Sequence, residues 1–476
     1  MGQEIASHSF SEADFQRFAH HLQAETALLA RWFEDNRFEQ VHPVAGFELE
    51  ACLITPTGDP NPINQAYLRH MNNPLVVPEL AQFNVEINGT PQPLREKALS
   101  QMAAELAETW QQCCQGAEDL EAQLLMIGIL PTLNPALLTL ATISPMERYY
   151  ALSEQVLRLR QGQELGLNIS GRHPLTMQHA DIIMLESATT SFQIHVQVDP
   201  DQAVRLFNAA QIASAPTVAL GANAPYFLGH DLWQETRIPL FEQAIDGIPT
   251  PTSPRQRVSF GTHYVQHSLL ECFQENLHNY PILLPVLMEA DPAQLPHLRL
   301  HNGTIWRWNR PLIGVDGERP HLRLEHRSLA AGPTVSDMMA NLAFFLGLMQ
   351  SLASQEIAPE SQLSFAHARS NFYQAAQHGL SASVIWWDPS HPRPLLPLIQ
   401  EVLLPQARQG LMDLCVSGDD IDHYLGIIAA RLSHSQNGAI WQQRYCAKHG
   451  NNMQQLTRAY WQRQQSGIPV HAWDLD

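Results

Sequence analysis

Four short segments alternate apolar and polar residues, and their polar positions carry side chains able to bind cations or anions. The segments are GFELEA (46–51), QFNVEIN (82–88), SFQIHVQV (191–198) and HLRLEHR (321–327). Because side chains point to alternate faces along a strand, each segment predicts a strand with one apolar and one polar face. The predicted polar faces hold Glu48, Glu50, Gln82, Asn84, Glu86, Asn88, Ser191, Gln193, His195, Gln197, Arg323, Glu325 and Arg327.

These polar faces indicate binding of a divalent cation. They contain no lysine, and their candidate ligands are Glu48, Glu50, Glu86, His195 and Glu325. Carboxylates crowded on adjacent strands repel one another unless a cation neutralises them. Oxygen ligands with one imidazole favour Mg²⁺ or Mn²⁺ over zinc. The interleaved Arg323 and Arg327 add forked donors for a phosphate or a carboxylate.

A plainer interpretation stays open for each segment taken alone. An antiparallel sheet with one face in water shows the same alternation. His195 by itself would more often be a histidine of the core or of a sheet edge, and only its strand partners favour a ligand role. A solvated face usually mixes Lys, Thr, Ser and Glu, so the content of the four faces together favours a functional site.

The strands need a scaffold, and the remaining pattern predicts an α+β layout with strands in the first two thirds and helices behind them. Ser11 and Asp14 form a capping box for a helix that ends near Glu34. Further helices are predicted at 94–115, 146–161, 202–214 and 232–244, further strands at 123–129 and 304–308, and a loop at 55–78. Pro333 opens a region that is almost wholly helical to Trp461.

Composition and charge exclude several classes of protein. The formal net charge is -19 and no basic run offsets it, so nucleic acid and anionic lipid are unsuitable partners. The N-terminal MGQEIASHSFSEADF lacks the basic start and apolar run of a signal peptide, and no later apolar stretch reads as long enough to span a bilayer. We therefore expect a cytoplasmic protein that binds no membrane.

The positions of the cysteines and lysines exclude further kinds of site. The six cysteines are scattered without a CxxC, so neither a disulfide framework nor a zinc knuckle is indicated. Lys97 and Lys448 are the only lysines, and neither lies in a GK[ST] context, which excludes Walker-type NTPases. With 476 residues and 45% apolar content, we expect one catalytic domain over 1–476. Its sheet-bearing core would cover about 40–345, and its mainly helical part about 333–476.

Five fragments, in order, resemble one family: GFELE, FNVEIN, SFQIHVQVDP, GANAPYFLG and HLRLEHRSLAAGPTVSDMMAN, between residues 44 and 345. They are similar to glutamate-cysteine ligase family 2, the bacterial and plant glutamate-cysteine ligases of glutathione biosynthesis and related carboxylate-amine ligases. The resemblance implies a glutamine-synthetase-like fold, in which a curved, mainly antiparallel sheet flanked by helices forms a funnel. It also implies ATP as co-substrate, Mg²⁺ or Mn²⁺ as cofactor, and phosphorylation of the glutamate γ-carboxylate before an amine, usually that of cysteine, displaces phosphate. The oligomeric state is left undecided, and a homo-oligomer is compatible with the sequence.

The resemblance also implies roles for individual residues. The metal ligands would be Glu48, Glu50, Glu79, Glu86, His195 and Glu325. Arg327, in the family's ExR pattern, would contact the transferred phosphoryl group or the substrate carboxylate, with Arg323 beside it. Arg237 in ETRIPLF would grip the amino acid or phosphate, although a surface cation on a helix is equally compatible with its sequence. Arg148 in ERYY and Arg307 in WRWNRP would contact the nucleotide, and the tryptophans of WRWNRP suit either core packing or an adenine shelf.

Two alternatives remain beside glutamate-cysteine ligation. A carboxylate-amine ligase for another acid or amine would keep every metal residue and differ only in its substrate pocket. A non-catalytic, metal-stabilised binding protein would need no anion clamp beside its cation, and the triplet Arg323, Glu325 and Arg327 argues against it.

Overall fold

The computed structural model describes residues 4–5, 8–40, 42–245, 256–315 and 319–476. Its centre is an open, eight-stranded sheet in which all pairs are antiparallel. The main path runs β13-β14-β8-β1-β3-β2, and β4 and β5 also pair with β1. The strands are β1 (Val44–Ile54), β2 (Val76–Pro78), β3 (Asn84–Asn88), β4 (Gln92–Pro93), β5 (Gln123–Leu125), β8 (Phe192–Val198), β13 (Asn309–Gly314) and β14 (His321–His326).

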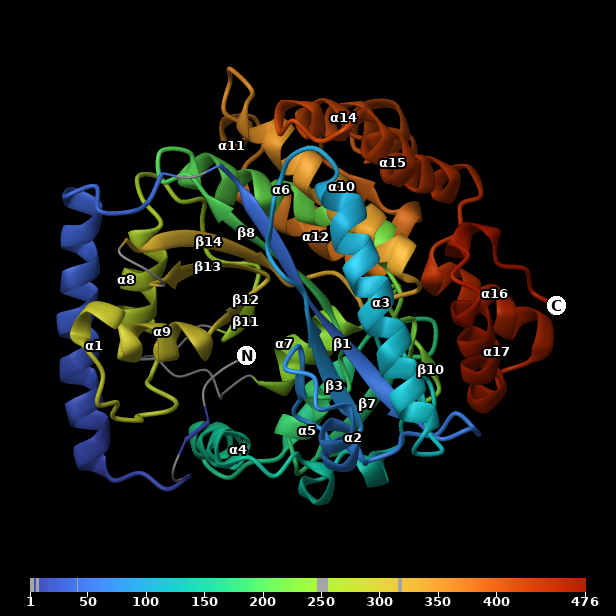
Figure 1. Ribbon diagram of the computed structural model, residues 1–476, viewed down its shortest axis with the longest axis horizontal. Coiled ribbons are helices and arrows are strands. Elements are labelled where there is room, and N and C mark those ends of the chain that lie inside the picture. The colour runs from blue at the N-terminus through green and yellow to red at the C-terminus, as the bar shows by residue number, and fades with distance from the viewer. Residues whose placement is uncertain (1–3, 6–7, 41, 246–255, 316–318) are drawn as a thin grey trace.

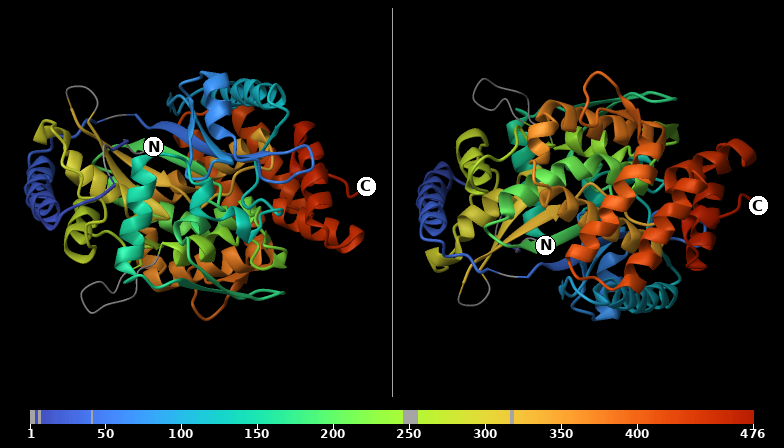
Figure 2. Two further views of the ribbon diagram at one scale, coloured as in Figure 1. Left: turned by 90° about the horizontal axis from the view of Figure 1, so that it is seen from below. Right: turned by 90° about the horizontal axis from the view of Figure 1, so that it is seen from above.

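Helices surround this sheet, with α1 at one end of the molecule and α16 and α17 at the other (Figures 1 and 2). The helices of the first part are α1 (Glu12–Glu34), α2 (Asn64–Met71), α3 (Ala98–Glu118), α4 (Glu147–Leu159), α5 (Ile183–Glu186), α6 (Ala203–Gly221), α7 (Arg237–Ala244), α8 (Leu270–Asn279) and α9 (Pro296–Gly303). Those of the second part are α10 (Val335–Ala353), α11 (Pro359–Gln362), α12 (Phe365–His378), α13 (Leu395–Leu398), α14 (Leu404–Asp413), α15 (Gly418–Ser433), α16 (Gly438–His449) and α17 (Met453–Gln465). The predicted α+β layout is confirmed.

In the part of the chain that the structure describes, four two-stranded sheets lie outside the main sheet. They are β6 (Leu165–Ile169) with β7 (Leu175–His179), β9 (Tyr226–Phe227) with β10 (His230–Asp231), β11 (Val258–Ser259) with β12 (Trp306–Arg307), and β15 (Ser383–Val384) with β16 (Arg393–Pro394). The β6–β7 hairpin was not predicted, although the buried-exposed alternation of LGLNI in β6 carries its signal.

The structure confirms some of the helices and strands predicted from the sequence and corrects others. The backbone N–H of Ser11 donates to Asp14 Oδ2 at 2.8 Å, so the capping box that begins α1 is confirmed. The predicted loop at 55–78 is wrong in part, because it contains α2 and β2. The strand expected at 304–308 is only the two-residue β12, and β13 enters the main sheet instead. Pro311 is tolerated in β13 because that strand is the sheet edge, where a missing N–H costs no ladder bond.

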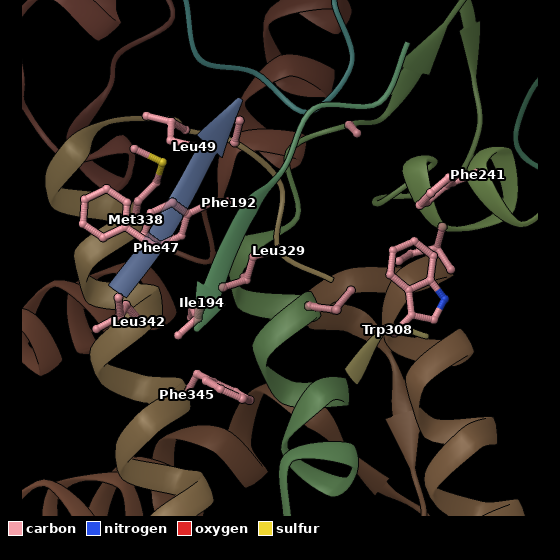
Figure 3. Packing of buried hydrophobic residues seen from close by; sticks show 14 of the residues in the cluster. Phe47, Leu49, Phe192, Ile194, Phe241, Trp308, Leu329, Met338, Leu342 and Phe345 are labelled. Carbon is pink, nitrogen blue, oxygen red and sulfur yellow. The ribbon is translucent and has the colours of Figure 1, made fainter. Parts of the chain in front are cut away.

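The apolar face of the sheet is covered by α10. Figure 3 shows Met338, Leu342 and Phe345 of α10 beside Phe47 and Leu49 of β1 and Phe192 and Ile194 of β8, all buried. The rings of Phe47 and Phe192 lie 5.4 Å apart between centroids. Full burial of each such side chain contributes about 1.5–3 kcal/mol. One face of the sheet is thus committed to the core, which leaves the polar face to build a site.

Helix α10 resembles a membrane-spanning helix in its length and apolar composition. By length and composition alone, α10 could cross a bilayer, and no other helix of the described residues could. This corrects the expectation that no apolar stretch is long enough. In the structure, 78% of its apolar window is buried, and it packs on α6, α14 and α15.

Where α10 crosses α14, two glycines bring the helix backbones into contact. A Cβ added to Gly410 would overlap the carbonyl oxygen of Gly347, and one added to Gly347 would overlap that of Ala407. Because backbone atoms cannot yield as a flexible side chain can, we expect Gly410→Ala to lower the free energy of unfolding by about 2–3 kcal/mol. Urea unfolding would measure it. Gly426→Ala in α15, where a new Cβ meets nothing within 4 Å, should instead raise stability by about 0.5–1 kcal/mol. Equal effects of the two substitutions would contradict this account of the crossing.

Candidate functional site

Strand register brings the polar residues of four strands onto one face. Glu325 of β14 lies opposite His195 of β8, and Glu50 of β1 lies opposite Glu86 of β3. Glu48 of β1 lies opposite Gln193 of β8. Because directly opposed residues of an antiparallel pair share a face, side chains separated by up to 277 positions meet there.

The centre of the site is formed by Glu48, His195 and Glu325, whose ligand atoms all lie within 4.8 Å of one another. His195 Nε2 is 3.3 Å from Glu48 Oε1 and 3.7 Å from Glu325 Oε1. Both ring nitrogens of His195 are buried, and within the described part of the chain neither makes a hydrogen bond. This buried imidazole and the two carboxylates beside it fit a divalent cation.

Electrostatics keep two of these ligands ionised. Burial opposes the charge of Glu48, but attraction to His195 outweighs it and lowers the pKa of Glu48 to about 2. Burial likewise opposes the charge of Glu325, but Arg310 and Arg327 hold its pKa well below the usual range. Arg310 grips Glu325 with two hydrogen bonds, from Nε to Oε2 at 2.7 Å and from Nη2 to Oε1 at 2.9 Å. This forked pair orients the carboxylate as well as keeping it charged.

A second group of carboxylates, Glu50, Glu79, Glu86 and Glu186, adjoins this centre, and the pKa of each is raised. Burial, with the charges of Glu48 and Glu50, raises the pKa of Glu86 to about 7. Burial, with the charge of Glu50, raises that of Glu186 to about 8. Crowded carboxylates of this kind need protons or cations to be stable. Glu186 was missed in the sequence because it lies in the short helix α5 and in none of the alternating strands.

Glu50 is the most firmly held of these carboxylates. It accepts hydrogen bonds from the Ser191 backbone N–H at 2.7 Å, the Ser191 hydroxyl at 3.0 Å and Gln193 Nε2 at 2.9 Å. Burial raises its pKa despite the opposing charges of Arg327 and Arg237. Of the six residues predicted as metal ligands, the structure therefore clusters Glu48, His195 and Glu325 directly and places Glu50, Glu79 and Glu86 in the adjoining group.

Two of the predicted arginines, Arg327 and Arg323, lie beside Glu325 on the polar side of β14. Arg327 donates from Nη1 to Gln193 Oε1 at 2.5 Å and lies 3.3 Å from Glu325 Oε2. Arg323 lies on the same face of β14, and its buried Nε has no hydrogen-bond partner among the described residues. Arg323 and Arg327 therefore flank Glu325 as the cations that face the site.

The other three predicted arginines contact protein groups outside the cluster of Glu48, His195 and Glu325. Arg237 is buried, pairs with Glu235 Oε1 at 3.2 Å and donates to the Ser328 carbonyl at 3.2 Å, so it is no surface cation. Arg307 is buried and bound to Glu275 at 3.0 Å and Asn276 at 2.7 Å. The Arg148 guanidinium lies 5.3 Å from the Tyr149 ring centroid, and its charge acts on the buried Glu79.

The structure assigns a role to one of the two tryptophans of WRWNRP, Trp308. Trp308 is 1% exposed, donates from Nε1 to Glu242 Oε1 at 2.9 Å and packs against Phe241 with ring centroids 5.9 Å apart (Figure 3). Trp308 is therefore a core residue. An adenine shelf would have to involve Trp306, which is half-buried.

A pocket of about 970 Å³ lies elsewhere, between the end of α1 and the start of α6. Its lining includes Phe33, Phe38, Asp201, His267 and Arg319, and none of the residues predicted for the site. The candidate site is therefore the carboxylate cluster, where the buried charges meet and His195 makes no hydrogen bond within the described residues.

A model of the protein family described as glutamate-cysteine ligase family 2 matches residues 44–459. The chain belongs to this family. Membership makes it a ligase of the glutamate-cysteine ligase type and confirms the carboxylate-amine ligase class that the sequence fragments implied. No curated protein matches the sequence.

Solved structures show the same fold for this family member. It is similar to the glutamate-cysteine ligase of Francisella tularensis in complex with AMP, with a TM-score of 0.59 and 12% identity over 92% of this chain and 91% of that one. It is also similar to a bifunctional glutathione synthetase of Pasteurella multocida, with a TM-score of 0.51 and 11% identity over 93% of this chain and 54% of that one. The predicted glutamine-synthetase-like fold is confirmed, with a sheet that is open.

Proposed function

We propose that the protein joins the γ-carboxylate of glutamate to an amine, with cysteine as the favoured amine substrate. The reaction uses ATP and Mg²⁺ and proceeds through an acyl phosphate. The observation that carries this proposal is the cluster of Glu48, His195 and Glu325, flanked by Arg323 and Arg327, in which the buried imidazole makes no hydrogen bond within the described residues. A cation site beside an anion clamp suits phosphoryl transfer between two anions. The family supports the reaction class, and the AMP complex of the Francisella relative supports a nucleotide substrate.

Each part of the site has a distinct task in this reaction. When bound at Glu48, His195 and Glu325, Mg²⁺ supplies charge that screens the repulsion between the triphosphate and the substrate carboxylate. Arg327 contacts Gln193 and Glu325 through Nη1, so its other nitrogens can fork onto the transferred phosphoryl oxygens. Arg310 orients Glu325 from behind. The incoming amine forms a C–N bond to the acyl carbon, the C–O bond to phosphate breaks with its electron pair on the phosphate, and the amine nitrogen gives up one proton to the phosphate or to solvent.

Interception by hydroxylamine tests the proposed function. The enzyme with ATP, Mg²⁺ and glutamate should convert hydroxylamine to γ-glutamyl hydroxamate with one phosphate released per hydroxamate, because a small nucleophile can reach an acyl phosphate whatever the natural amine is. A colorimetric ferric-hydroxamate assay would measure it. Mn²⁺ should replace Mg²⁺ and Zn²⁺ should not, since carboxylate-rich sites suit hard cations.

The same assay separates the alternatives. Hydroxamate from another carboxylic acid, but none from glutamate, would identify a ligase of different specificity. If a panel of acids gives none, the proposed function is wrong and a metal-stabilised binding protein becomes the better description. Full turnover in chelator would instead overturn the proposed requirement for Mg²⁺.

A further inference from the structure

Helices α16 and α17 lie at the end of the molecule opposite α1, beyond the sheet (Figures 1 and 2). Three of their polar side chains nevertheless point inward and are almost fully buried: Gln442 of α16, and Tyr460 and Gln464 of α17. Buried polar groups cost free energy unless they are hydrogen-bonded, so their partners show what these helices hold.

The first partner is Met126, which directly follows β5. Gln464 Oε1 accepts from the Met126 N–H at 3.0 Å, and Gln464 Nε2 donates to the Met126 carbonyl at 2.7 Å. The Tyr460 hydroxyl donates to the same carbonyl at 3.1 Å. Gln464 Nε2 also donates to the carbonyl of Pro333, just before α10. Helix α17 thus ties the segment after β5 to the segment before α10.

The segment after β5 in turn supports Glu50. The Gly128 carbonyl accepts from the Thr190 N–H at 2.9 Å, and the Thr190 hydroxyl donates to the Ile127 carbonyl. The next residue, Ser191, donates twice to the Glu50 carboxylate. A shift of the segment that α17 holds would therefore be transmitted to the donors of Glu50.

A second branch leads to Arg237 through Asn223. Asn223 Nδ2 donates to the Tyr460 hydroxyl at 2.8 Å, and Gln442 Nε2 donates to Asn223 Oδ1 at 3.0 Å. The Asn223 N–H donates to Glu235 Oε2 at 3.1 Å, and Glu235 Oε1 pairs with Arg237 at 3.2 Å. The Tyr460 hydroxyl is the atom at which both branches meet.

We propose that α16 and α17 set the position of Glu50 and Arg237 for catalysis, with Tyr460 as the central positioning residue. This inference rests on the proposed function for its kinetic consequence, while the coupling itself is a property of the protein alone. Displacing a site group by a fraction of an ångström slows phosphoryl transfer between aligned reactants without abolishing substrate binding.

Tyr460→Phe removes only the shared hydroxyl and keeps the buried ring. We expect kcat for hydroxamate formation to fall about 10-fold or more, with the KM for ATP changed less than about twofold. Thr457→Val is the matched control, because it also removes a buried hydroxyl from α17, one whose hydrogen bond among the described residues goes to the Met453 carbonyl of the same helix. It should lower the melting temperature to a similar extent and leave kcat unchanged. Wild-type kcat in Tyr460→Phe, or an equal loss in Thr457→Val, would overturn the positioning role.

Hydrogen–deuterium exchange supplies a readout that needs no activity. In Tyr460→Phe, without metal or nucleotide, amides of peptides covering 123–133 and 188–195 should exchange at least about 10-fold faster than in the wild type and in Thr457→Val. Unchanged exchange in both peptides would overturn the coupling. An inactive wild-type enzyme would instead count against the proposed function, and exchange alone would then decide whether Tyr460 holds these segments.

Discussion

Glu48→Gln is expected to lower kcat about 100-fold or more while the melting temperature stays within a few degrees of the wild type. Glu48 meets His195 and Glu325 at the candidate cation site, and its low pKa of about 2 keeps it charged at any working pH. The amide keeps the shape but removes the negative charge that a divalent cation needs. His195, the partner that Glu48 leaves, still lies 3.7 Å from Glu325 Oε1, so the substitution leaves no buried charge without a partner. Hydroxamate formation at saturating Mg²⁺ would measure the loss, and thermal unfolding would measure stability.

A control separates lost charge from a general effect of substitution. Glu401→Gln changes an exposed carboxylate outside the sheet and should leave both quantities unchanged. Glu325→Gln serves less well, because Arg310 and Arg327 both depend on Glu325. Leaving buried cations unpaired costs about 3–5 kcal/mol. Glu325→Gln should therefore lose stability together with activity. Wild-type turnover in Glu48→Gln would remove Glu48 from the cation site.

Arg327→Lys is expected to lower the hydroxamate yield about 100-fold although the charge is retained. The planar guanidinium can bond Gln193 with one nitrogen and present its other N–H groups to phosphoryl oxygens, whereas a single ammonium cannot do both. Initial rates over a range of ATP and glutamate concentrations would show whether kcat or KM carries the loss. A fall in kcat at unchanged KM would place the contact in the transition state.

Arg17→Lys is the matched control, because Arg17 is an exposed arginine paired only with its helix neighbour Asp14 among the contacts the structure describes. It should be indistinguishable from the wild type. If Arg327→Lys keeps at least half of the wild-type rate, the forked contact is not required, and Arg323, whose Nε lacks a partner in the described residues, becomes the next candidate.

Much of the site could be predicted because it is built on strands. Alternation with period two assigns Glu48, Glu50, Glu86, His195 and Glu325 to polar faces wherever the strands lie, and the register confirms that they share one face. Arg323 and Arg327 follow from the same rule. Glu186 and Arg310 could not be found in this way. Glu186 lies in a short helix, and Arg310 lies in a strand that the sequence placed elsewhere.

The sequence by itself determined the α+β layout, the polar strand faces and the family, because these depend on local periodicity and on ordered motifs. Only the tertiary structure decided which carboxylates meet. It brought Glu48, His195 and Glu325 within 4.8 Å, paired Glu325 with Arg310 and left Arg323 Nε without a hydrogen-bond partner among the described residues. It also showed that Tyr460 supports residues more than 230 positions earlier in the chain. The physical reason is that periodicity specifies the face on which a side chain lies, whereas its partners depend on strand register and on helices that pack from distant parts of the chain.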